Sequence, residues 1–306
     1  MKKIALLISD NLLPSAENAR PDRFELIEQM GKLTPALASH GMELIETRWR
    51  EIADRAAEFA AILPLMVWDY FEGNEEAFLT AIAKAEQVTP VFNSFNILKW
   101  NADKAYLDEL HARGAPVIRT LTVERVTPKN VARAFEELET DTLVIKPQVG
   151  GGAWRQVLHK KGQPFPAADI LPPEGALIQP FLSSVTEEGE YSFLYFGGRF
   201  SHAARKTPKA GDYRIQSIYG GAEETYIPSQ LERDRARDIL DVLDATPLYA
   251  RVDLLRGDDG TLKLIELECI EPYLYLPHAK GEGEDNEGAQ KFAKALKARL
   301  DKSKAD

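Results

Sequence analysis

The chain has 306 residues, of which 44% are hydrophobic and 28% are charged, and its formal net charge is −10 at pH 7. This length allows a sizeable buried core and predicts two or three lobes. The acid excess argues against a general nucleic-acid binder, because neutralising phosphates requires an excess of Lys and Arg. The single cysteine, Cys269, excludes an internal disulfide framework and fits a reducing compartment. Neither a signal peptide nor an apolar run of about 20 residues is found, so we expect a cytoplasmic protein without membrane or nucleic-acid partners.

The first third of the chain alternates between strand and helix patterns. Residues 4–8 form an apolar run of the kind that fills a buried parallel strand. The rhythm that follows is of the βαβ type and predicts a small open α/β domain. The predicted strands lie at residues 4–8, 42–47, 65–67 and near Val91, and the predicted helices lie at residues 22–39 and 75–86.

The pattern changes near Trp100. We expect Asn101 to cap a helix over residues 102–113, and Thr127 with Pro128 to open a second helix. Ser229 and Glu232 form a capping box that predicts a helix to about residue 243. Further strands are predicted at residues 142–147, 155–158, 176–179, 191–196, 200–206, 248–255 and 261–268, with a hairpin turn at Gly197-Gly198, a loop at residues 281–288 and a last helix at residues 288–301.

Three carboxylates on two neighbouring strands give the strongest chemical signal. Residues two apart in a strand point to the same face, so Glu266 and Glu268 project together, and Asp253 can face them from the strand before. Converging carboxylates repel one another unless a cation lies between them. A solvent-exposed strand face is the alternative, but Ile265 and Leu267 indicate a central strand. Hard oxygen ligands in this number predict Mg²⁺, or Mn²⁺, shared with substrate phosphates.

A second group of residues suits a nucleotide. Lys146 ends an apolar strand and is followed by glycines at positions 150–152, whose backbone N–H groups can approach an anion closely. Neither a P-loop nor a GxGxxG sequence is present. Pro180 can offer its carbonyl and Leu182 its N–H to an adenine edge, and Glu190 can accept hydrogen bonds from a ribose. Each of these features alone is common at ordinary strand ends.

In this order, over residues 100–272, the pieces resemble the ATP-grasp superfamily. The order is Lys104, Lys146 and the glycine loop, the Gln-Pro-Phe-Leu segment 179–182, Glu190, Arg214, Arg251-Val-Asp253 and Glu266-Leu-Glu268. Within the superfamily the chain looks closest to prokaryotic glutathione synthetase-like ligases. It is nearer still to O-ureido-serine cyclo-ligases of cycloserine biosynthesis and their relatives, through residues 101–104 and 265–272 and through Trp68-Asp69-Tyr70.

The resemblance implies an α/β (α+β) ATP-grasp fold with an N-terminal open α/β pre-ATP-grasp domain. It places that domain at residues 1–97, a small lid subdomain at residues 98–182, and a C-terminal subdomain with the metal site at residues 183–306. Dimers or tetramers are usual for the resembled group, which makes a homo-oligomer the corresponding expectation.

The resemblance also implies a role for each matching residue. Phosphates of ATP would be held by Lys104, Lys146 and the loop around Gly151. Arg214 would clamp the γ-phosphate, and Arg251 would face the oxyanion. The remaining implied contacts are adenine at Gln179, Pro180, Phe181 and Leu182, ribose at Glu190, and Mg²⁺ at Asp253, Glu266 and Glu268. Residues 150–152 and 208–221 are expected to act as lids, because their glycines can serve as hinges.

The activity implied is an ATP- and Mg²⁺-dependent ligase that joins a carboxylate to an amine, or a related nucleophile, through an acyl phosphate. Its substrate would be small and amino-acid-like or peptide-like. Two departures argue against glutathione synthesis itself: Glu268 stands where that group usually has Asn, and Ser192 stands where it has a basic residue. A small-molecule kinase with the same site and a non-catalytic nucleotide-binding protein are the alternatives. Trp68 and Tyr70 suit an acceptor pocket and a hydrophobic core equally well.

Overall fold

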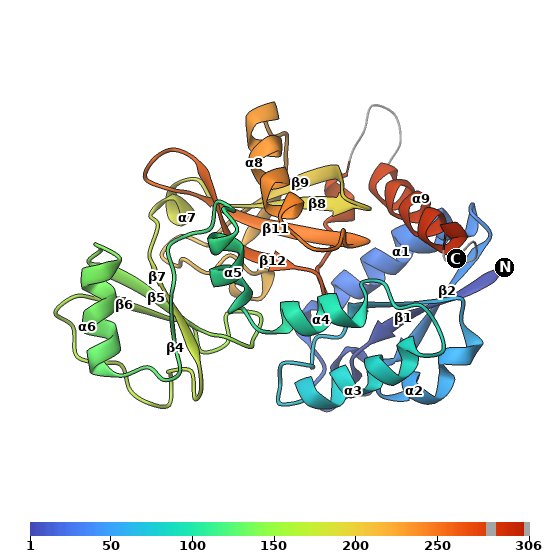
Figure 1. Ribbon diagram of the computed structural model, residues 1–306, viewed down its shortest axis with the longest axis horizontal. Helices are drawn as coiled ribbons and strands as arrows, with labels where there is room; N and C mark the ends of the chain where they lie inside the picture. The colour runs from blue at the N-terminus through green and yellow to red at the C-terminus, as the bar shows by residue number, and fades with distance from the viewer. Residues whose placement is uncertain (280–285, 303–306) are drawn as a thin grey trace.

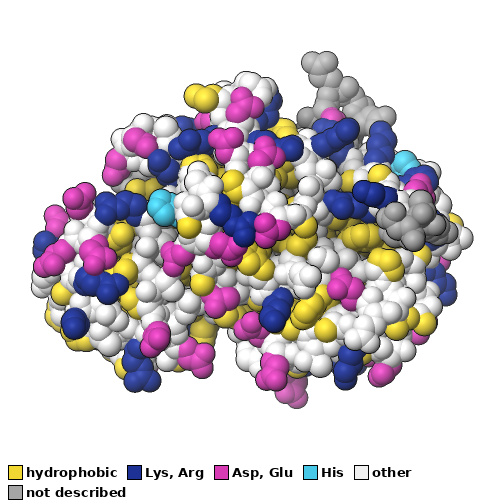
Figure 2. Space-filling model, in the orientation of Figure 1, with side chains coloured by type: hydrophobic (Ala, Val, Ile, Leu, Met, Phe, Trp, Pro, Cys, Tyr) yellow, Lys and Arg dark blue, Asp and Glu magenta, His cyan; other side chains and the backbone are white. Residues whose placement is uncertain are grey.

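Three β-sheets and the helices around them make up the molecule in the computed structural model, which describes residues 1–279 and 286–302 (Figure 1). Most of the predicted loop at residues 281–288 therefore lies outside the described residues. Acidic and basic side chains are interspersed over the face seen in Figure 2. In the part of the chain that is described, no helix combines the length and the apolar character needed to cross a membrane.

The first sheet is parallel, with strand order β2-β1-β3. Its members are β1 (Lys2–Ile8), β2 (Met42–Arg48) and β3 (Ala61–Met66), and helices α1 (Phe24–Ala38), α2 (Ile52–Arg55) and α3 (Glu75–Glu86) accompany them. The strand predicted near Val91 was wrong in extent, because Val91 makes only an isolated bridge to Ile62. The apolar runs of β1 and β3 are buried on both faces, as parallel strands flanked by helices require.

The last helix, α9 (Glu287–Lys302), returns to this first sheet and lies beside α1 (Figure 1). Phe292 is fully buried and packs against Phe196 of β8, with ring centroids 5.3 Å apart. One hydrophobic cluster thus contains residues from both ends of the chain.

The second sheet is antiparallel, with order β4-β7-β5-β6. It comprises β4 (Leu121–Val123), β5 (Thr142–Pro147), β6 (Val157–Lys160) and β7 (Ala176–Pro180), with α6 (Pro128–Glu137) beside it. Thr127 caps α6 as predicted, since its side chain accepts a hydrogen bond from the Asn130 amide.

Two short helices, α4 (Phe95–Ala102) and α5 (Tyr106–Ala112), precede this sheet, and the prediction for Asn101 was wrong. Asn101 does not cap a helix over residues 102–113 but lies inside the last turn of α4. Its side-chain amide donates to the Leu267 carbonyl at 2.8 Å and accepts from the Cys269 amide at 2.8 Å. Asn101 therefore ties α4 to the strand that carries the predicted metal ligands.

The third sheet has order β10-β9-β8-β11-β12. It comprises β8 (Glu190–Phe196), β9 (Arg199–Thr207), β10 (Ala222–Tyr226), β11 (Tyr249–Arg256) and β12 (Leu262–Glu268), and α7 (Ser184–Glu187) and α8 (Gln230–Asp241) accompany it. Gly197 and Gly198 turn the β8–β9 hairpin with positive φ angles, and the Ser229–Glu232 capping box opens α8, both as predicted. Phe193, Val252 and Leu267 face an apolar core shared with α8, which leaves the opposite face of the sheet for polar residues.

Candidate active site

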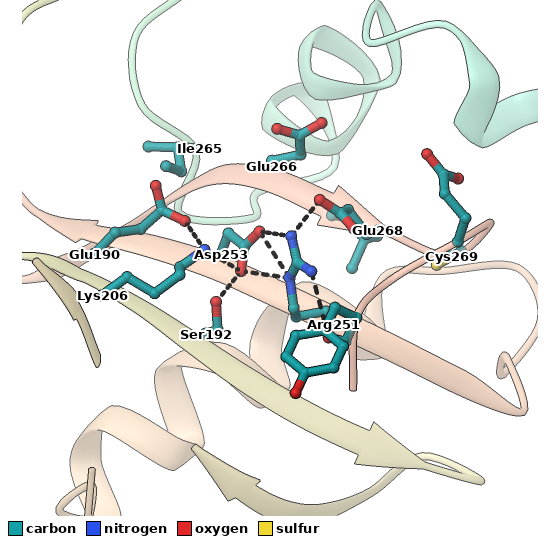
Figure 3. A network of polar contacts seen from close by, with 12 residues as sticks. Glu190, Ser192, Lys206, Arg251, Asp253, Ile265, Glu266, Glu268 and Cys269 are labelled. Carbon is teal, nitrogen blue, oxygen red and sulfur yellow. Dashed lines mark hydrogen bonds and ion pairs between the residues drawn. The ribbon is translucent and has the colours of Figure 1, made fainter. Parts of the chain in front are cut away.

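One face of the five-stranded sheet is lined with charge (Figure 3). The strand register places Asp253 opposite Glu266 and Ser192, and it places Arg251 opposite Glu268. Glu190 of β8 lies opposite Lys206 of β9. Because alternate residues of a strand share a face, these side chains all project on the same side of the sheet. The set is Glu190, Ser192, Lys206, Arg251, Asp253, Glu266 and Glu268.

Asp253 lies at the centre of this face and is 1% exposed. Its carboxylate accepts hydrogen bonds from Arg251 Nε at 3.0 Å and from the Ser192 hydroxyl, and Lys206 Nζ lies 3.6 Å away. Burial acts to raise the pKa of Asp253, but the two cations outweigh it and hold the pKa below its usual range. Asp253 is therefore an ionised and almost fully buried carboxylate.

Lys206 is a site residue that the sequence reasoning missed. It is 3% exposed and forms an ion pair with Glu190, and its two carboxylate neighbours raise its pKa against the effect of burial. Ser192 had suggested that a basic residue was lacking next to Glu190. The lysine instead arrives from the neighbouring strand, so the charge is present at the site. The Gly197-Gly198 turn was the available signal, because pairing the strands outward from it brings positions 190 and 206 nearly opposite each other.

Two further lysines reach the same face from outside the sheet. Lys104 Nζ lies 3.1 Å from Glu266 Oε1, and it also contacts the Gly150 carbonyl. Lys146, at the end of β5, donates from Nζ to the Ile265 carbonyl at 3.1 Å. Burial lowers the pKa of Lys146, whereas Lys104 and Lys146 together outweigh burial and lower the pKa of Glu266. The second sheet is thus joined to β12 through charged groups.

Each of the three predicted metal ligands already has a cationic partner. Glu268 contacts Arg251 Nη2, and burial raises its pKa to about 7 despite that contact. Among residues 1–279 and 286–302, no three His, Cys, Asp or Glu side chains are arranged as a metal-binding group. The expected convergence of three carboxylates is therefore not found in that part of the chain. The donors still fit Mg²⁺ in kind, because they are hard oxygens on adjacent strands with Asp253 directly opposite Glu266.

A cavity of about 260 Å³ opens over this face, and every predicted site residue lines it. Gln179 to Leu182 form part of its wall after β7. The Phe181 amide donates to the Thr142 carbonyl at 2.9 Å, whereas the Leu182 amide donates to no described residue. Leu182 therefore retains a free donor at the place where an adenine edge was predicted.

The two predicted lid segments also line the cavity. Gly151 packs against the ring of Phe71 so closely that a Cβ atom there would lie 2.9 Å from Phe71 Cε1. Arg214 is on the cavity wall, with its guanidinium hydrogen-bonded to Asp212 at 2.7 Å. Both segments thus lie around the same opening.

Trp68 and Tyr70 occupy positions that are compatible with both interpretations that the sequence left open. Trp68 and Tyr70 are 6% and 4% exposed, and both line the cavity. Trp68 Nε1 donates to the Glu271 carbonyl at 3.1 Å, so the N-terminal lobe is fastened to the segment after β12. Asp69 is held away from the cavity by Trp49 Nε1 at 2.6 Å.

Glu271 and Tyr275 are two more cavity residues that the sequence did not single out. The Glu271 carboxylate has no hydrogen-bonding partner among the described residues, and burial raises its pKa well above the usual range. Tyr275 has a φ angle of 46°, and its ring lies 5.5 Å from the Arg251 guanidinium and 5.7 Å from Lys206 Nζ. Cys269 is fully buried, and burial raises the pKa of its thiol.

The solved structures that this chain resembles give the class: the chain has the α/β fold that the sequence predicted, and its relatives indicate an ATP-grasp ligase. Within that class it is related to enzymes of cycloserine biosynthesis. Residues 4–93 match the family described as D-cycloserine synthetase DcsG, N-terminal domain. The chain is 27% identical over 286 residues to the cycloserine biosynthesis protein DcsG of Streptomyces lavendulae, which covers 89% of this chain and 93% of the relative.

Solved structures agree with this relationship. The crystal structure of D-cycloserine synthetase DcsG superposes with a TM-score of 0.82 at 25% identity, over 97% of this chain and 99% of that one. D-alanine–D-alanine ligase from Bacillus anthracis, complexed with ATP, superposes with a TM-score of 0.66 at 13% identity, over 99% and 100% of the two chains. The second likeness shows the fold alone. The ligase prediction is confirmed, and the kinase and the non-catalytic alternatives are disfavoured.

Proposed function

We propose that the enzyme uses ATP and Mg²⁺ to convert the carboxylate of a small amino-acid-like substrate into an acyl phosphate, which a nitrogen nucleophile then attacks. The observation that carries this proposal is that Lys104, Lys146 and Arg251 line one cavity together with three carboxylates. A carboxylate is a poor electrophile, and phosphorylation supplies a good leaving group. The protein's contribution is then positioning and neutralisation of charge.

The charged face suits both steps of this reaction, the phosphorylation of the carboxylate and the attack on the acyl phosphate. Lys104 and Lys146 would hold the phosphates, and Arg214 would neutralise charge on the transferring phosphoryl group. Arg251 would stabilise the tetrahedral oxyanion formed during attack. Asp253, Glu266 and Glu268 would hold Mg²⁺, which would supply positive charge to neutralise the phosphates. The adenine would lie along residues 179–182, with its ribose at Glu190.

These roles require ion pairs to be exchanged. Glu266 would leave Lys104 for the metal, and Lys104 would then be available to phosphate, so opposite charges are replaced rather than lost. Glu190 is bound to Lys206, and a ribose hydroxyl would share that carboxylate. The same exchange would occur at Glu268 and Arg251. Buried charges that are always paired avoid the large energetic penalty of isolated ones.

We propose domains at residues 1–97, 98–182 and 183–306, a cytoplasmic location and a homo-oligomeric assembly. The relatives are named as D-cycloserine synthetase and D-alanine–D-alanine ligase, which makes amino acids and their derivatives the first substrates to test. The substrate would enter beside Trp68 and Tyr70, where the N-terminal lobe closes the cavity.

The test is release of phosphate from ATP and Mg²⁺ in the presence of pools of amino acids, dipeptides, and hydroxamate or ureido acids. Stimulation by one pool, with ADP and a ligated product formed in equal amounts, is the expected result. A phosphorylated product that accumulates without ligation would instead establish a kinase. Glu266→Gln should abolish Mg²⁺-dependent turnover while keeping the fold, and Glu43→Gln, on the exposed surface of β2, is the matched control.

A further inference from the structure

Asp212 organises the segment between β9 and β10. One of its oxygens, Oδ1, accepts hydrogen bonds from the amides of Tyr213 at 2.8 Å and Arg214 at 3.0 Å, so it shapes the backbone. The other oxygen, Oδ2, accepts from Arg214 Nη2 at 2.7 Å and from Nε at 3.1 Å. These bonds hold the pKa of Asp212 well below its usual range. A single carboxylate thus fixes both the local turn and the direction of the Arg214 guanidinium.

Tyr219 holds the same guanidinium from another side. The Arg214 Cζ atom lies 3.9 Å from the centroid of the Tyr219 ring, which is cation–π distance. The Tyr219 hydroxyl donates to the Gly152 carbonyl at 3.3 Å, in the loop after β5. The two lid segments are therefore joined through one tyrosine, whose ring contacts Arg214 and whose hydroxyl contacts the glycine loop.

A third contact ties this arrangement to the N-terminal lobe. Ser217, in the short 3-10 helix Ser217–Tyr219, donates to Glu25 of α1 at 3.4 Å, and this helix lies against the helix Pro21–Arg23. The segment that carries Arg214 consequently touches both of the structures that it faces across the cavity.

A stabilising role would not account for these contacts. The side chains of Arg214 and Asp212 are 37% and 23% exposed, and ion pairs at such positions contribute about 0–1 kcal/mol to folding. A free arginine side chain samples many rotamers, and fixing it in advance removes an entropic cost from the step that uses it. We therefore attribute the contacts of Asp212 and Tyr219 to the position in which they hold the Arg214 guanidinium.

We propose that Asp212 and Tyr219 are positioning residues, which hold Arg214 over the cavity and link its placement to closure of the glycine loop. This inference rests on the proposed function, in which Arg214 neutralises charge on the phosphoryl group. Arg214 lines the cavity, whereas Asp212 and Tyr219 lie outside its lining, so both would act through the arginine. Their effect is expected in the rate of the chemical step rather than in the binding of ATP.

The experiment compares Asp212→Asn, Tyr219→Phe and Tyr219→Leu with the wild type. Asp212→Asn and Tyr219→Leu should lower the rate of substrate-stimulated phosphate release at saturating ATP by about 10- to 100-fold, because misplacement of a catalytic group has effects of that size. Tyr219→Phe keeps the ring and should fall between them and the wild type. ATP affinity by calorimetry and the melting temperature should be unchanged. Asp258→Asn, in the exposed turn after β11, and Tyr226→Phe, outside the cavity, are the matched controls.

A double-mutant cycle separates positioning from a general structural effect. In an Arg214→Ala background, Asp212→Asn should cause no further loss of rate, because Asp212 acts only through the arginine. A further loss of similar size in that background would overturn the proposal, as would wild-type rates in both Asp212→Asn and Tyr219→Leu.

Failure of the proposed function gives a different result, because the wild type itself would then release no phosphate with any pool. In that case the rate of trypsin cleavage after Lys209, an exposed residue of the same segment, tests whether the Asp212 and Tyr219 contacts hold the segment in place. Loss of the Asp212 or Tyr219 contacts should speed this cleavage by about threefold or more, because the segment opens more often. Equal cleavage of wild type, Asp212→Asn and Tyr219→Leu would refute the positioning role independently of any activity.

Discussion

At the scale of single residues, Lys206 is the cation shared by two buried carboxylates. Its Nζ atom forms an ion pair with Glu190 and lies 3.6 Å from Asp253. Replacing it by Met would leave Glu190 without its cationic partner in a dry site. We expect Lys206→Met to lower the free energy of unfolding by about 3–5 kcal/mol, the usual effect of breaking a buried ion pair. Urea denaturation at pH 7 measures this change. Lys209→Met, at an exposed position, is the control, and an equal small effect of both variants would contradict the prediction.

The burial of His202 predicts how the free energy of unfolding depends on pH. Its ring is 7% exposed and bonded to the Leu274 carbonyl at 2.9 Å, and burial lowers its pKa to about 4. An unfolded histidine titrates near 6.5, so the unfolded state takes up a proton first as the pH falls. The native state is thereby destabilised between pH 6.5 and 4, by about 2 kcal/mol at pH 5 relative to pH 7.5.

The comparison of His202→Gln with wild type at these two pH values checks this prediction. The variant should be less stable at pH 7.5 but should lose about 2 kcal/mol less on moving to pH 5. His111→Gln, on the exposed surface of α5, should keep the wild-type dependence. An unchanged pH dependence in His202→Gln would assign the acid sensitivity to other groups.

The residues that the sequence missed share a physical feature. Lys206 reaches the cavity through strand register, for which the Gly197-Gly198 turn is a signal only once the two strands are paired outward from it. Glu271 and Tyr275 reach the cavity from an irregular segment, which leaves no local pattern in the chain. The carboxylates of β11 and β12 could be predicted because alternation alone places them on one face. The lysine partners of these carboxylates could not be predicted, because a neutralising cation can come from any neighbouring element.

At the scale of elements, the close packing of Gly151 against Phe71 joins the glycine loop to the N-terminal lobe. A Cβ atom at position 151 would lie 2.9 Å from Phe71 Cε1 and 3.0 Å from Cζ. Gly151→Ala should therefore displace the loop, at a cost of about 1–3 kcal/mol. Because 1.4 kcal/mol is tenfold in an equilibrium constant, we expect ATP affinity to fall by about tenfold, measured by calorimetry.

Removing part of the obstructing ring should restore the loop. Gly151→Ala combined with Phe71→Leu is expected to regain most of the lost ATP affinity. Gly31→Ala is the matched control, because a Cβ atom in that exposed part of α1 meets no atom within 4 Å. That control should raise the free energy of unfolding by about 0.5–1 kcal/mol through the helix backbone. Wild-type affinity in Gly151→Ala would show that the loop does not hold the nucleotide.

The elements themselves were largely predictable, and the exceptions have physical causes. Most predicted strands agree with the structure to within a few residues, because apolar alternation and glycine turns mark them. Strand β10 was missed because Ala-Glu-Glu-Thr-Tyr is a polar edge strand without an apolar face. Asn101 was misassigned because asparagine is common at helix caps, whereas here its amide satisfies backbone groups of β12 and the segment after it.

At the scale of the whole molecule, residues from all three sheet regions meet at one cavity. Trp68 comes from the first region, Lys146 from the second and Asp253 from the third. The last helix packs back onto the first lobe, so the lobes at both ends of the chain share a core. The order of motifs along the sequence predicted this fold. It could not show that α9 packs against α1, because the two helices lie at opposite ends of the sequence.

A ligand that bridges these regions should stabilise the entire molecule. At 100 times its dissociation constant, ATP with Mg²⁺ would add about 2.7 kcal/mol to the free energy of unfolding. At an unfolding entropy of about 2.1 cal/mol/K per residue, 1 kcal/mol shifts the melting temperature of a chain of this length by about 1.6 °C, so a rise of about 4 °C is expected. Lys146 tests whether ligand binding and stability are coupled in this way. Burial lowers its pKa, so its charged form destabilises the folded protein when no ligand is bound.

Lys146→Met should therefore move two quantities in opposite directions. The melting temperature without ligand should equal or exceed that of wild type, since a buried charge is replaced by an apolar side chain of similar length. The shift caused by ATP and Mg²⁺ should fall by half or more, because a charged hydrogen bond to phosphate contributes about 1.5–3 kcal/mol. Lys84→Met, on the exposed face of α3, should leave both quantities unchanged. A full ATP shift in Lys146→Met would refute its phosphate role, whereas a large loss of unliganded stability would make Lys146 a structural residue that joins β5 to β12. The opposite signs are what distinguish a residue retained for binding from one retained for folding.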